Sequence, residues 1–282
     1  MGEDQTTNLG AVKYWKEGSF MSMEENVGII TLNRPEALNS INRDVFEGLE
    51  QAFDALNTDP EVRVIIITGK GEKAFCTGGD VKMFREYYTE GTVVDDVKTE
   101  ARGLVQRGHQ LMQRFEESPK VIIAALNGLC LGGGLELAMA CDLRIAADEA
   151  KLGFPEVAIG LLPAMGGTQR TPKLLGMARA KELVLTASMI TAQEGLAMGL
   201  VSKVVPRDEL MSTASFMAAK IADNAPLAVA KAKDAINKTR ELSEQEGFKL
   251  EESHILELLE TEDAREGIKA VGEKRKPQFK GK

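Results

Sequence analysis

Two glutamates in apolar surroundings are the residues of this chain best suited to acid–base chemistry. Glu136 follows three glycines in the stretch LCLGGGLELAMACD (129–142), and Glu156 lies in KLGFPEVAIGLLPAMGGTQR (151–170). Loss of water around a carboxyl group raises its pKa toward neutrality, so one of two such groups can hold a proton while the other accepts one. Taken alone, each glutamate also fits a purely structural role.

The glycine cluster before the first glutamate suggests a backbone anion site. Gly132, Gly133 and Gly134 precede a short helix expected near 134–140, and glycine lets N–H groups at a helix start approach a ligand closely. A second glycine loop, AFCTGGDVKMF (74–84), offers another N–H group, and two converging donors would make an oxyanion hole. Tight packing explains the glycines equally well. If they serve an oxyanion hole, Gly133→Val should fold yet lose activity at least as severely as a substitution of one glutamate. Gly132 and Gly134 should tolerate substitution better if their role is the turn itself.

Alternating strand and helix patterns predict the elements that position these residues. Such alternation is typical of parallel β-structure with helices outside. The expected elements are a hairpin over 12–32 that includes SFMSME, a helix over about 41–56, a strand at 62–68, a polar helix near 81–88 that Asp80 can cap, a mobile charged stretch near 90–99, a helix at about 100–117, and strands at 121–126 and 143–147.

The character of the chain changes after Pro206, where only helical patterns follow. Their apolar faces need another surface, and we expect that of a neighbouring subunit. The expected helices are 209–222, 226–241 and 248–260, with Phe248, Ile255 and Leu258 buried in their packing. We therefore predict an N-terminal tail (1–11), a β/α core (12–205) and a C-terminal helical oligomerisation region (206–282).

Composition limits the classes of protein to which the chain can belong. With 282 residues and a net charge of −8, it is expected to form one large domain or a domain with an appendage, and not to bind nucleic acid. No apolar run has the roughly 18 residues of a membrane helix, and no signal-peptide pattern is recognised. Cys76, Cys130 and Cys141 lack disulfide or zinc spacing and indicate a reducing compartment, so we expect a cytoplasmic protein.

Other chemistries fit the motifs poorly. The stretch GKGEKA (69–74) matches a dinucleotide fingerprint, but Gly78 and Gly79 follow where that site needs a helix. His109 and His254 lie in helical patterns that suit ordinary surface or core positions, and no nucleophile elbow is present. Nicotinamide chemistry and serine hydrolysis are therefore not expected.

Six segments together form a specific signature: ITLNRPEALNSIN, AFCTGGDVKMF, NGLCLGGGLELAMACD, FPEVAIGLLPAMGGTQR, GLVSKVV and EKRKPQF. From about residue 12 to residue 279 the chain resembles the crotonase superfamily, and within it the enoyl-CoA hydratases. The resemblance implies an α/β fold, a spiral of ββα units followed by a helical trimerisation region, and a homotrimer or homohexamer. It also implies an acyl-CoA substrate, with coenzyme A as part of that substrate and with no separate cofactor and no metal.

The resemblance also implies roles for individual residues. Glu136 and Glu156 match the catalytic pair, in which the first deprotonates the water that attacks Cβ and the second supplies the proton to Cα. The N–H groups of Gly79 and Gly133 match the oxyanion hole around the thioester oxygen. The implied substrate contacts are Ala37, Gly79, Asp80, Val81, Lys82 and Lys274, of which Lys274 is a candidate phosphate contact from its own or the adjacent subunit.

The leading hypothesis is reversible addition of water to a 2-enoyl-CoA. The same residues fit dehydration of a 3-hydroxyacyl-CoA as the physiological direction, or a cyclic or aryl enoyl-CoA substrate. A Δ3,Δ2-enoyl-CoA isomerase and a binding or scaffold protein without the chemistry are further alternatives. Val271-Gly272 replaces an aromatic residue common in relatives, and Pro163-Ala164 replaces a common Pro-Gly, which leaves the length and shape of the acyl chain open.

Overall fold

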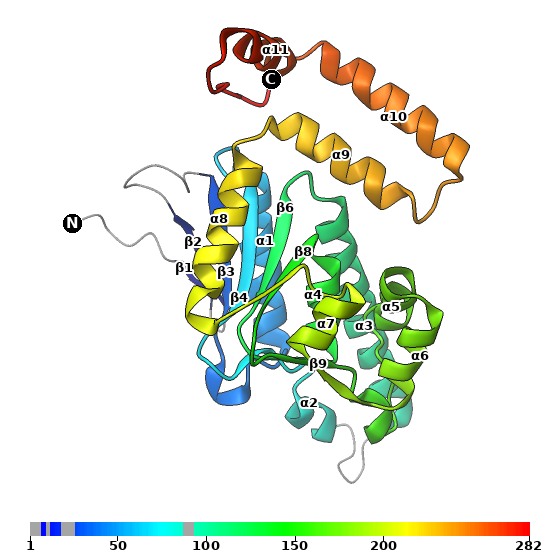
Figure 1. Cartoon of the computed structure of the whole chain (residues 1–282). Coiled ribbons are helices and arrows are strands. Elements are labelled where there is room, and N and C mark those ends of the chain that lie inside the picture. The colour runs from blue at the N-terminus through cyan, green and yellow to red at the C-terminus, as the bar shows by residue number, and fades with distance from the viewer. Residues whose placement is uncertain (1–6, 10–11, 18–25, 87–92) are drawn as a thin grey trace, which may run out of the picture.

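The computed structural model describes residues 7–9, 12–17, 26–86 and 93–282, and its centre is a largely parallel sheet (Figure 1). The expected turn at Gly18 and the segment SFMSME (19–24) lie outside the described residues. The strands on both sides of them, β2 and β3, pair antiparallel. In the described part of the chain the sheet has the order β1 (Thr7–Leu9), β2 (Val12–Glu17), β3 (Val27–Leu32), β4 (Val64–Gly69), β6 (Val121–Leu126), β8 (Leu143–Ala147) and β11 (Lys203–Val205). From β3 to β11 neighbouring strands are parallel.

A second, smaller sheet is built from strands of three residues each. Its order is β10 (Met189–Thr191), β9 (Lys151–Gly153), β7 (Leu129–Leu131) and β5 (Ala74–Cys76). Strand β5 follows β4, β7 follows β6, and β9 follows β8, so the chain repeats a strand–strand–helix turn. This arrangement confirms the expected α/β spiral. The residues 69–76 form a strand end, a turn and β5, which confirms that the GKGEKA stretch opens no helix.

Helices cover both faces of the large sheet. The apolar residues of one face pack against α1 (Arg43–Thr58), α3 (Val94–Glu117) and α4 (Gly133–Ala140). The other face packs against α8 (Leu210–Ala222). The remaining elements of this part are η1 (Pro35–Ala37), α2 (Val81–Glu86), η2 (Glu156–Ile159), α5 (Gly167–Leu175), α6 (Met177–Leu185), α7 (Ala192–Met198) and η3 (Arg207–Glu209).

Helix α3 begins earlier than the sequence predicts. The expectation of a mobile stretch near 90–99 is wrong for residues 94–99, which are helical, while 87–92 lie outside the described residues. Asp95 and Asp96 occupy the first turn, where carboxylates interact favourably with the helix dipole. The charges that suggested a loop are therefore those of a helix start.

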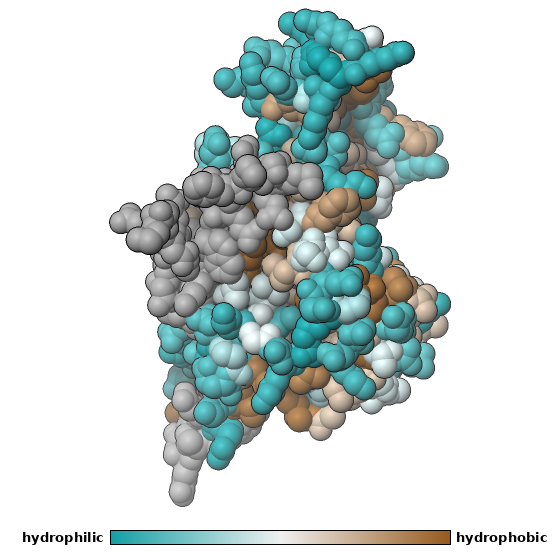
Figure 2. Space-filling model, turned by 60° about the vertical axis from the view of Figure 1, so that its left-hand side comes forward, coloured by the Kyte–Doolittle hydropathy of each residue, from teal (hydrophilic) through white to brown (hydrophobic). Residues whose placement is uncertain are grey.

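The C-terminal helices α9 (Pro226–Lys238), α10 (Glu244–Leu259) and α11 (Glu262–Glu273) extend beyond the sheet as an arm (Figure 1). Helix α10 starts before the expected residue 248, because Ser243 and Glu246 form a capping box. Helix α11 was not predicted. Figure 2 shows apolar side chains among the polar ones of this arm. Within the single chain Phe248 is 58% and Ile255 is 53% exposed, so their expected burial needs a surface outside this chain.

The expected boundary at residue 206 stays a prediction. The structure adds that α8 packs directly on the sheet and that Val229 of α9 packs against the same cluster, to which α10 and α11 add no residue in the described part of the chain. The three cysteines are buried and free, as expected. Among the described residues, no helix has the length and apolar character needed to cross a membrane.

Candidate active site

Glu136 is buried at the start of α4, with 2% of its surface exposed. The Gly167 N–H, at the start of α5, donates a hydrogen bond to its Oε1 atom at 2.6 Å. Burial raises the pKa of Glu136 to about 7, and the hydrogen bond from Gly167 limits this rise. The nearby charge of Glu156 adds to it. A carboxyl group with such a pKa can gain or lose a proton near neutral pH.

Glu156 approaches the same place from the start of η2, where Pro155 precedes it. Its carboxyl group lies so close to Gly132 that a Cβ atom at that glycine would overlap Oε1. Its Oε2 atom is buried and has no hydrogen-bond partner in the described part of the chain. Burial raises the pKa of this carboxyl group as well. The structure therefore brings the two predicted glutamates to one site.

The backbone of Gly79 is aligned by a single parallel bridge to Ile41. The Ile41 N–H donates to the Gly78 carbonyl at 2.7 Å, and the Asp80 N–H donates to the Ile41 carbonyl at 2.9 Å. In this pattern the N–H of Gly79 itself points away from Ile41. A Cβ atom placed on Gly133 would lie 3.7 Å from the Gly79 nitrogen, so the two predicted glycines are neighbours. Neither N–H donates to an acceptor among the described residues.

The three glycines before Glu136 differ in what a side chain would meet. At Gly133 the nearest atom to an added Cβ is the Gly78 Cα at 3.4 Å, which is an ordinary contact. At Gly134 the Cβ would overlap the Cys76 carbonyl, and Gly132 has a φ of +52° in addition to its contact with Glu156. The expectation that Gly132 and Gly134 tolerate substitution better than Gly133 is therefore wrong, because they are the two that closely approach other groups.

The predicted substrate-contact residues fall into two groups. Ala37 lies in η1 and Asp80 precedes α2, and these segments are joined by an ion pair of 3.0 Å between Arg34 and Asp80. Asp80 also accepts from the Lys82 N–H at 2.9 Å, as predicted for a residue that caps this helix. Val81 and Lys82 are exposed beside it.

Lys274 is not near this group. It is the exposed C-cap of α11, which Figure 1 places at the far end of the arm from α2 and α4. The chain therefore does not bring Lys274 to its own glutamates. A contact with a neighbouring subunit's substrate stays a prediction.

Two buried asparagines that were not predicted hold the turn 69–74, which leads into β5 and so toward Gly79. Asn39 donates to the Ala74 carbonyl at 2.7 Å, and Asn127 accepts from the Gly69 N–H at 3.1 Å and donates to the Gly71 carbonyl at 2.7 Å. Asn127 directly follows an apolar strand, and this position could have indicated a buried side chain that bonds the neighbouring backbone. Gly167 was also missed, although its GG pair precedes a helical pattern.

Comparison with known proteins agrees with this geometry. Residues 22–282 match the model of the family described as enoyl-CoA hydratase/isomerase. The chain is 41% identical to the short-chain-enoyl-CoA hydratase of Clostridium acetobutylicum over 91% of this chain and 95% of that protein. It is 40% identical to the (E)-benzylidenesuccinyl-CoA hydratase of Thauera aromatica, over 93% and 98% of the two chains.

The solved structures lead to the same family. The crystal structure of an enoyl-CoA hydratase from Bacillus anthracis superposes with a TM-score of 0.85 at 41% identity, and covers 91% of this chain and 96% of that one. The chain therefore belongs to the enoyl-CoA hydratase/isomerase family of enzymes.

Proposed function

We propose that this chain catalyses the reversible hydration of a 2-enoyl-CoA to a 3-hydroxyacyl-CoA. The observation that carries the proposal is the meeting of the buried Glu136 and the half-buried Glu156 beside the N–H groups of Gly79 and Gly133, which have no acceptor among the described residues. Relatives at about 40% identity that are named hydratases for short-chain and benzylidenesuccinyl substrates support the same reaction.

In this mechanism Glu136 removes a proton from water as the water oxygen forms a bond to Cβ. The electron pair of the Cα–Cβ double bond moves toward the thioester, whose oxygen becomes an enolate oxygen. The N–H groups of Gly79 and Gly133 donate to that oxygen, and the loss of one such donor typically lowers kcat by about 10²–10³.

Protonation of Cα completes the addition. Glu156 gives its proton to Cα, the enolate returns to a thioester, and one molecule of water has been added. Glu136 then carries the proton that Glu156 has lost, and transfer of one proton between the two groups restores the enzyme. Burial raises both pKa values, and the charge of Glu156 raises that of Glu136 further, which favours a pair that carries one proton between its two groups. The division into base and acid follows the family resemblance.

The assay follows the ultraviolet absorbance of crotonyl-CoA, which disappears as its double bond is hydrated. Glu136→Gln and Glu156→Gln should each lower kcat by at least about 10²-fold, since each amide keeps the size but loses the proton-transfer function. Binding of a saturated acyl-CoA should be nearly unchanged and serves as the control. Retention of a tenth of wild-type kcat by both variants would contradict the proposal.

The same assay separates the alternatives. A Δ3,Δ2-enoyl-CoA isomerase would convert a 3-enoyl-CoA to a conjugated product and would leave crotonyl-CoA unchanged, and a scaffold protein would do neither. A panel of linear, cyclic and aryl enoyl-CoA substrates, compared by kcat/KM, addresses the shape of the acyl group. Each methylene changes the free energy of binding in an apolar pocket by only about 1–3 kcal/mol, so the panel must include large differences.

The proposal includes assembly into a homotrimer or homohexamer. The exposed apolar residues of the arm support it, since a monomer would leave them in water. A cytoplasmic location is part of the same proposal, supported by three buried, unpaired cysteines.

A further inference from the structure

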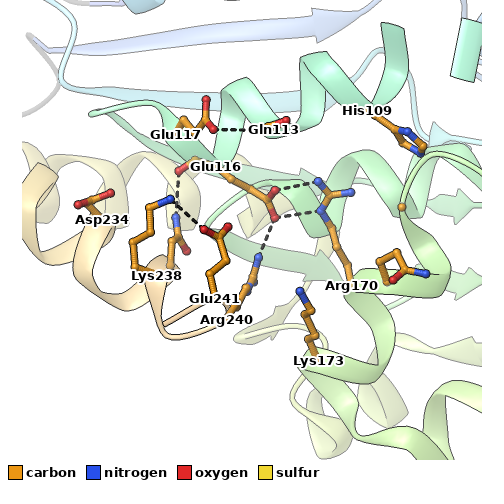
Figure 3. Close-up of a pocket in the computed structure, with 13 residues that line it drawn as sticks. His109, Gln113, Glu116, Glu117, Arg170, Lys173, Asp234, Lys238, Arg240 and Glu241 are labelled. Carbon is orange, nitrogen blue, oxygen red and sulfur yellow. Dashed lines mark hydrogen bonds and ion pairs between the residues drawn. The ribbon is translucent and has the colours of Figure 1, made fainter. Parts of the chain in front are cut away.

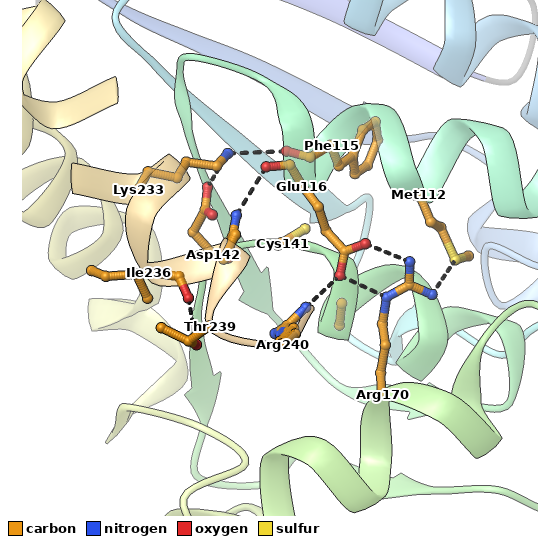
Figure 4. A network of polar contacts seen from close by, with 12 residues as sticks. Met112, Phe115, Glu116, Cys141, Asp142, Arg170, Lys233, Ile236, Thr239 and Arg240 are labelled. Atoms are coloured by element: carbon orange, nitrogen blue, oxygen red, sulfur yellow. Dashed lines mark hydrogen bonds and ion pairs between the residues drawn. The ribbon is translucent and has the colours of Figure 1, made fainter. Parts of the chain in front are cut away.

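A network of ion pairs joins α3, α5 and the residues that follow α9. Glu116, near the end of α3, accepts hydrogen bonds from Nε and Nη2 of Arg170 at 2.9 and 2.8 Å. Arg240, which follows α9, donates to the same carboxylate at 2.7 Å. Figures 3 and 4 show the two guanidinium groups converging on Glu116, beside a polar cavity of about 420 Å³.

The network keeps Glu116 ionised. Burial alone would raise the pKa of this carboxyl group, but the hydrogen bonds and charges of Arg170 and Arg240 lower it below its ordinary value. The Arg170 side chain is 13% and the Glu116 side chain 22% exposed, so the bidentate ion pair between them is sheltered from water. A bidentate ion pair that is sheltered from water fixes the orientation of the guanidinium group.

The third nitrogen of this guanidinium group reaches the turn before α5. Nη1 of Arg170 donates to the Met165 carbonyl at 3.2 Å. It also lies where a Cβ atom of Gly166 would be, and Gly166 has a φ of +109° that favours glycine. Arg170 therefore lies across the turn 165–167 and holds it from one side.

Helix α3 holds the same turn from another side. His109 Nε2 contacts the Ala164 carbonyl at 2.7 Å. The Met165 side chain fits against Gly108, where an added Cβ would lie 2.9 Å from its sulfur atom. The turn is thus fixed between α3 and α5.

This turn carries the groups that face Glu136. The Gly167 N–H donates to Glu136 Oε1, and the Met165 backbone N–H also favours the charged form of that carboxyl group. We propose that Arg170 is a positioning residue for hydration, which with Glu116 behind it fixes the 165–167 turn that orients the Glu136 carboxylate. The inference rests on the proposed function, because it takes Glu136 to be the base. Arg240 extends the support to the C-terminal arm.

The test compares four variants of the full-length chain with crotonyl-CoA as substrate. Arg170→Met removes the bidentate ion pair with Glu116. Arg170→Lys keeps the positive charge but can make only some of the hydrogen bonds to Glu116 and to the Met165 carbonyl. Because a displacement of about 1 Å can cost about 10²-fold in rate, Arg170→Met should lower kcat by about 10- to 100-fold. KM should change by less than about threefold, because Arg170 does not touch the proposed substrate site. Arg170→Lys should recover part of the lost kcat.

Lys173→Met is the matched control for loss of a positive charge. Lys173 lies on the same helix and lines the same cavity, and it forms no ion pair among the described residues. Its kcat should remain that of wild type. Thermal unfolding of every variant shows which of them fold. If Arg170→Met does not fold, the kcat of Arg170→Lys tests the proposal in its place.

The pH profile separates positioning from a simple effect of charge. With Glu136 as base, kcat/KM falls as pH decreases through its pKa, and Arg170→Met should move this fall to higher pH. Loss of the Arg170 charge and a weaker Gly167 hydrogen bond both act in that direction. Glu116→Gln removes a negative charge, which by itself would move the fall to lower pH and leave kcat unchanged. Positioning instead requires that Glu116→Gln lower kcat.

The outcomes for the proposal and for its basis are distinct. Wild-type kcat and an unshifted pH profile in Arg170→Met and Glu116→Gln, in a chain whose Glu136→Gln variant is inactive, would refute the positioning role and leave the hydratase proposal intact. A wild-type chain that hydrates no enoyl-CoA would overturn the proposed function first, and the positioning role with it.

Discussion

A series of substitutions at Gly133 tests whether the glycine run serves catalysis or packing. An alanine Cβ would meet its nearest atoms at 3.4 Å (Gly78 Cα), 3.6 Å (Met165 Cε) and 3.7 Å (Gly79 nitrogen), all ordinary contacts. Gly133→Ala should therefore fold with little loss of stability. The methyl groups of valine reach further and overpack the site, which typically costs about 1–3 kcal/mol and leaves most domains folded.

The catalytic effect should be much larger than the effect on stability. The added atoms at position 133 lie beside the Gly79 nitrogen, where the thioester oxygen would accept its hydrogen bonds. If valine removes one donor, kcat should fall by about 10²–10³-fold, which corresponds to about 2.7–4 kcal/mol of transition-state stabilisation. The kcat of Gly133→Ala should lie between those of Gly133→Val and the wild type.

The assay is crotonyl-CoA hydration at saturating substrate, with thermal unfolding of each variant measured in parallel. Gly134→Ala is the contrasting variant: its Cβ would overlap the Cys76 carbonyl, so it should lose stability first. Equal kcat for Gly133→Val and the wild type, with both folded, would refute the oxyanion-hole assignment and leave packing as the reason for the glycines.

Two further predictions concern the pair of glutamates and the arm. The kcat/KM for hydration should rise with pH through an apparent pKa of about 7, because burial holds Glu136 protonated below that value. A kcat/KM that does not change between pH 5 and 8 would exclude Glu136 as the base. Light scattering should show that the wild-type protein is a trimer or hexamer. The double variant Phe248→Glu, Ile255→Glu should shift the protein toward monomer, since both side chains are more than half exposed in the single chain. A monomeric wild type at micromolar concentration would contradict the predicted assembly.

The elements that hold the site were predictable where each carries a local pattern. The apolar neighbours Leu135 and Leu137 indicated that Glu136 is buried, and the structure agrees. Strands of six residues such as β4 and β6 were also evident from their β-branched composition. By contrast, strands of three residues such as β5 and β7 show no periodicity, so the patterns missed the second sheet.

Contacts between distant parts of the chain left no such signal. Gly79 and Gly133 become neighbours because β5 pairs with β7, and only the family resemblance indicated that they work together. Likewise, nothing around Glu116 in the sequence distinguishes it from Glu117, yet Glu116 binds Arg170 whereas Glu117 is bonded by Gln113 on its own helix. The Glu116–Arg170 pair depends on how α3 and α5 lie in the folded chain, whereas the Gln113–Glu117 bond lies within α3.

The burial that suits Glu136 for catalysis should also make the folded chain less stable when this group is charged. Its pKa is about 7 in the folded state against 4.5 ordinarily, so the folded state binds the proton more tightly than the unfolded state does. Stability therefore falls as pH rises from about 4.5 to 7, by about 3 kcal/mol for this group at most, and stays lower above that range.

Glu136→Gln removes this loss because the amide has no charge to bury and its oxygen can still accept from Gly167. The variant should thus be more stable than wild type at pH 8, by about 1–3 kcal/mol, and nearly equal to it at pH 5. Glu116→Gln should have the opposite effect. The pKa of Glu116 is lowered from its ordinary 4.5 in the folded state, so the carboxylate stabilises the fold at both pH 8 and pH 5 and this contribution is lost only below about pH 4.5; the variant should therefore be less stable than wild type at both pH values. Urea unfolding at the two pH values measures both differences. If Glu136→Gln were less stable than wild type at pH 8, the carboxylate would be a structural group, and its burial would need a different explanation from catalysis.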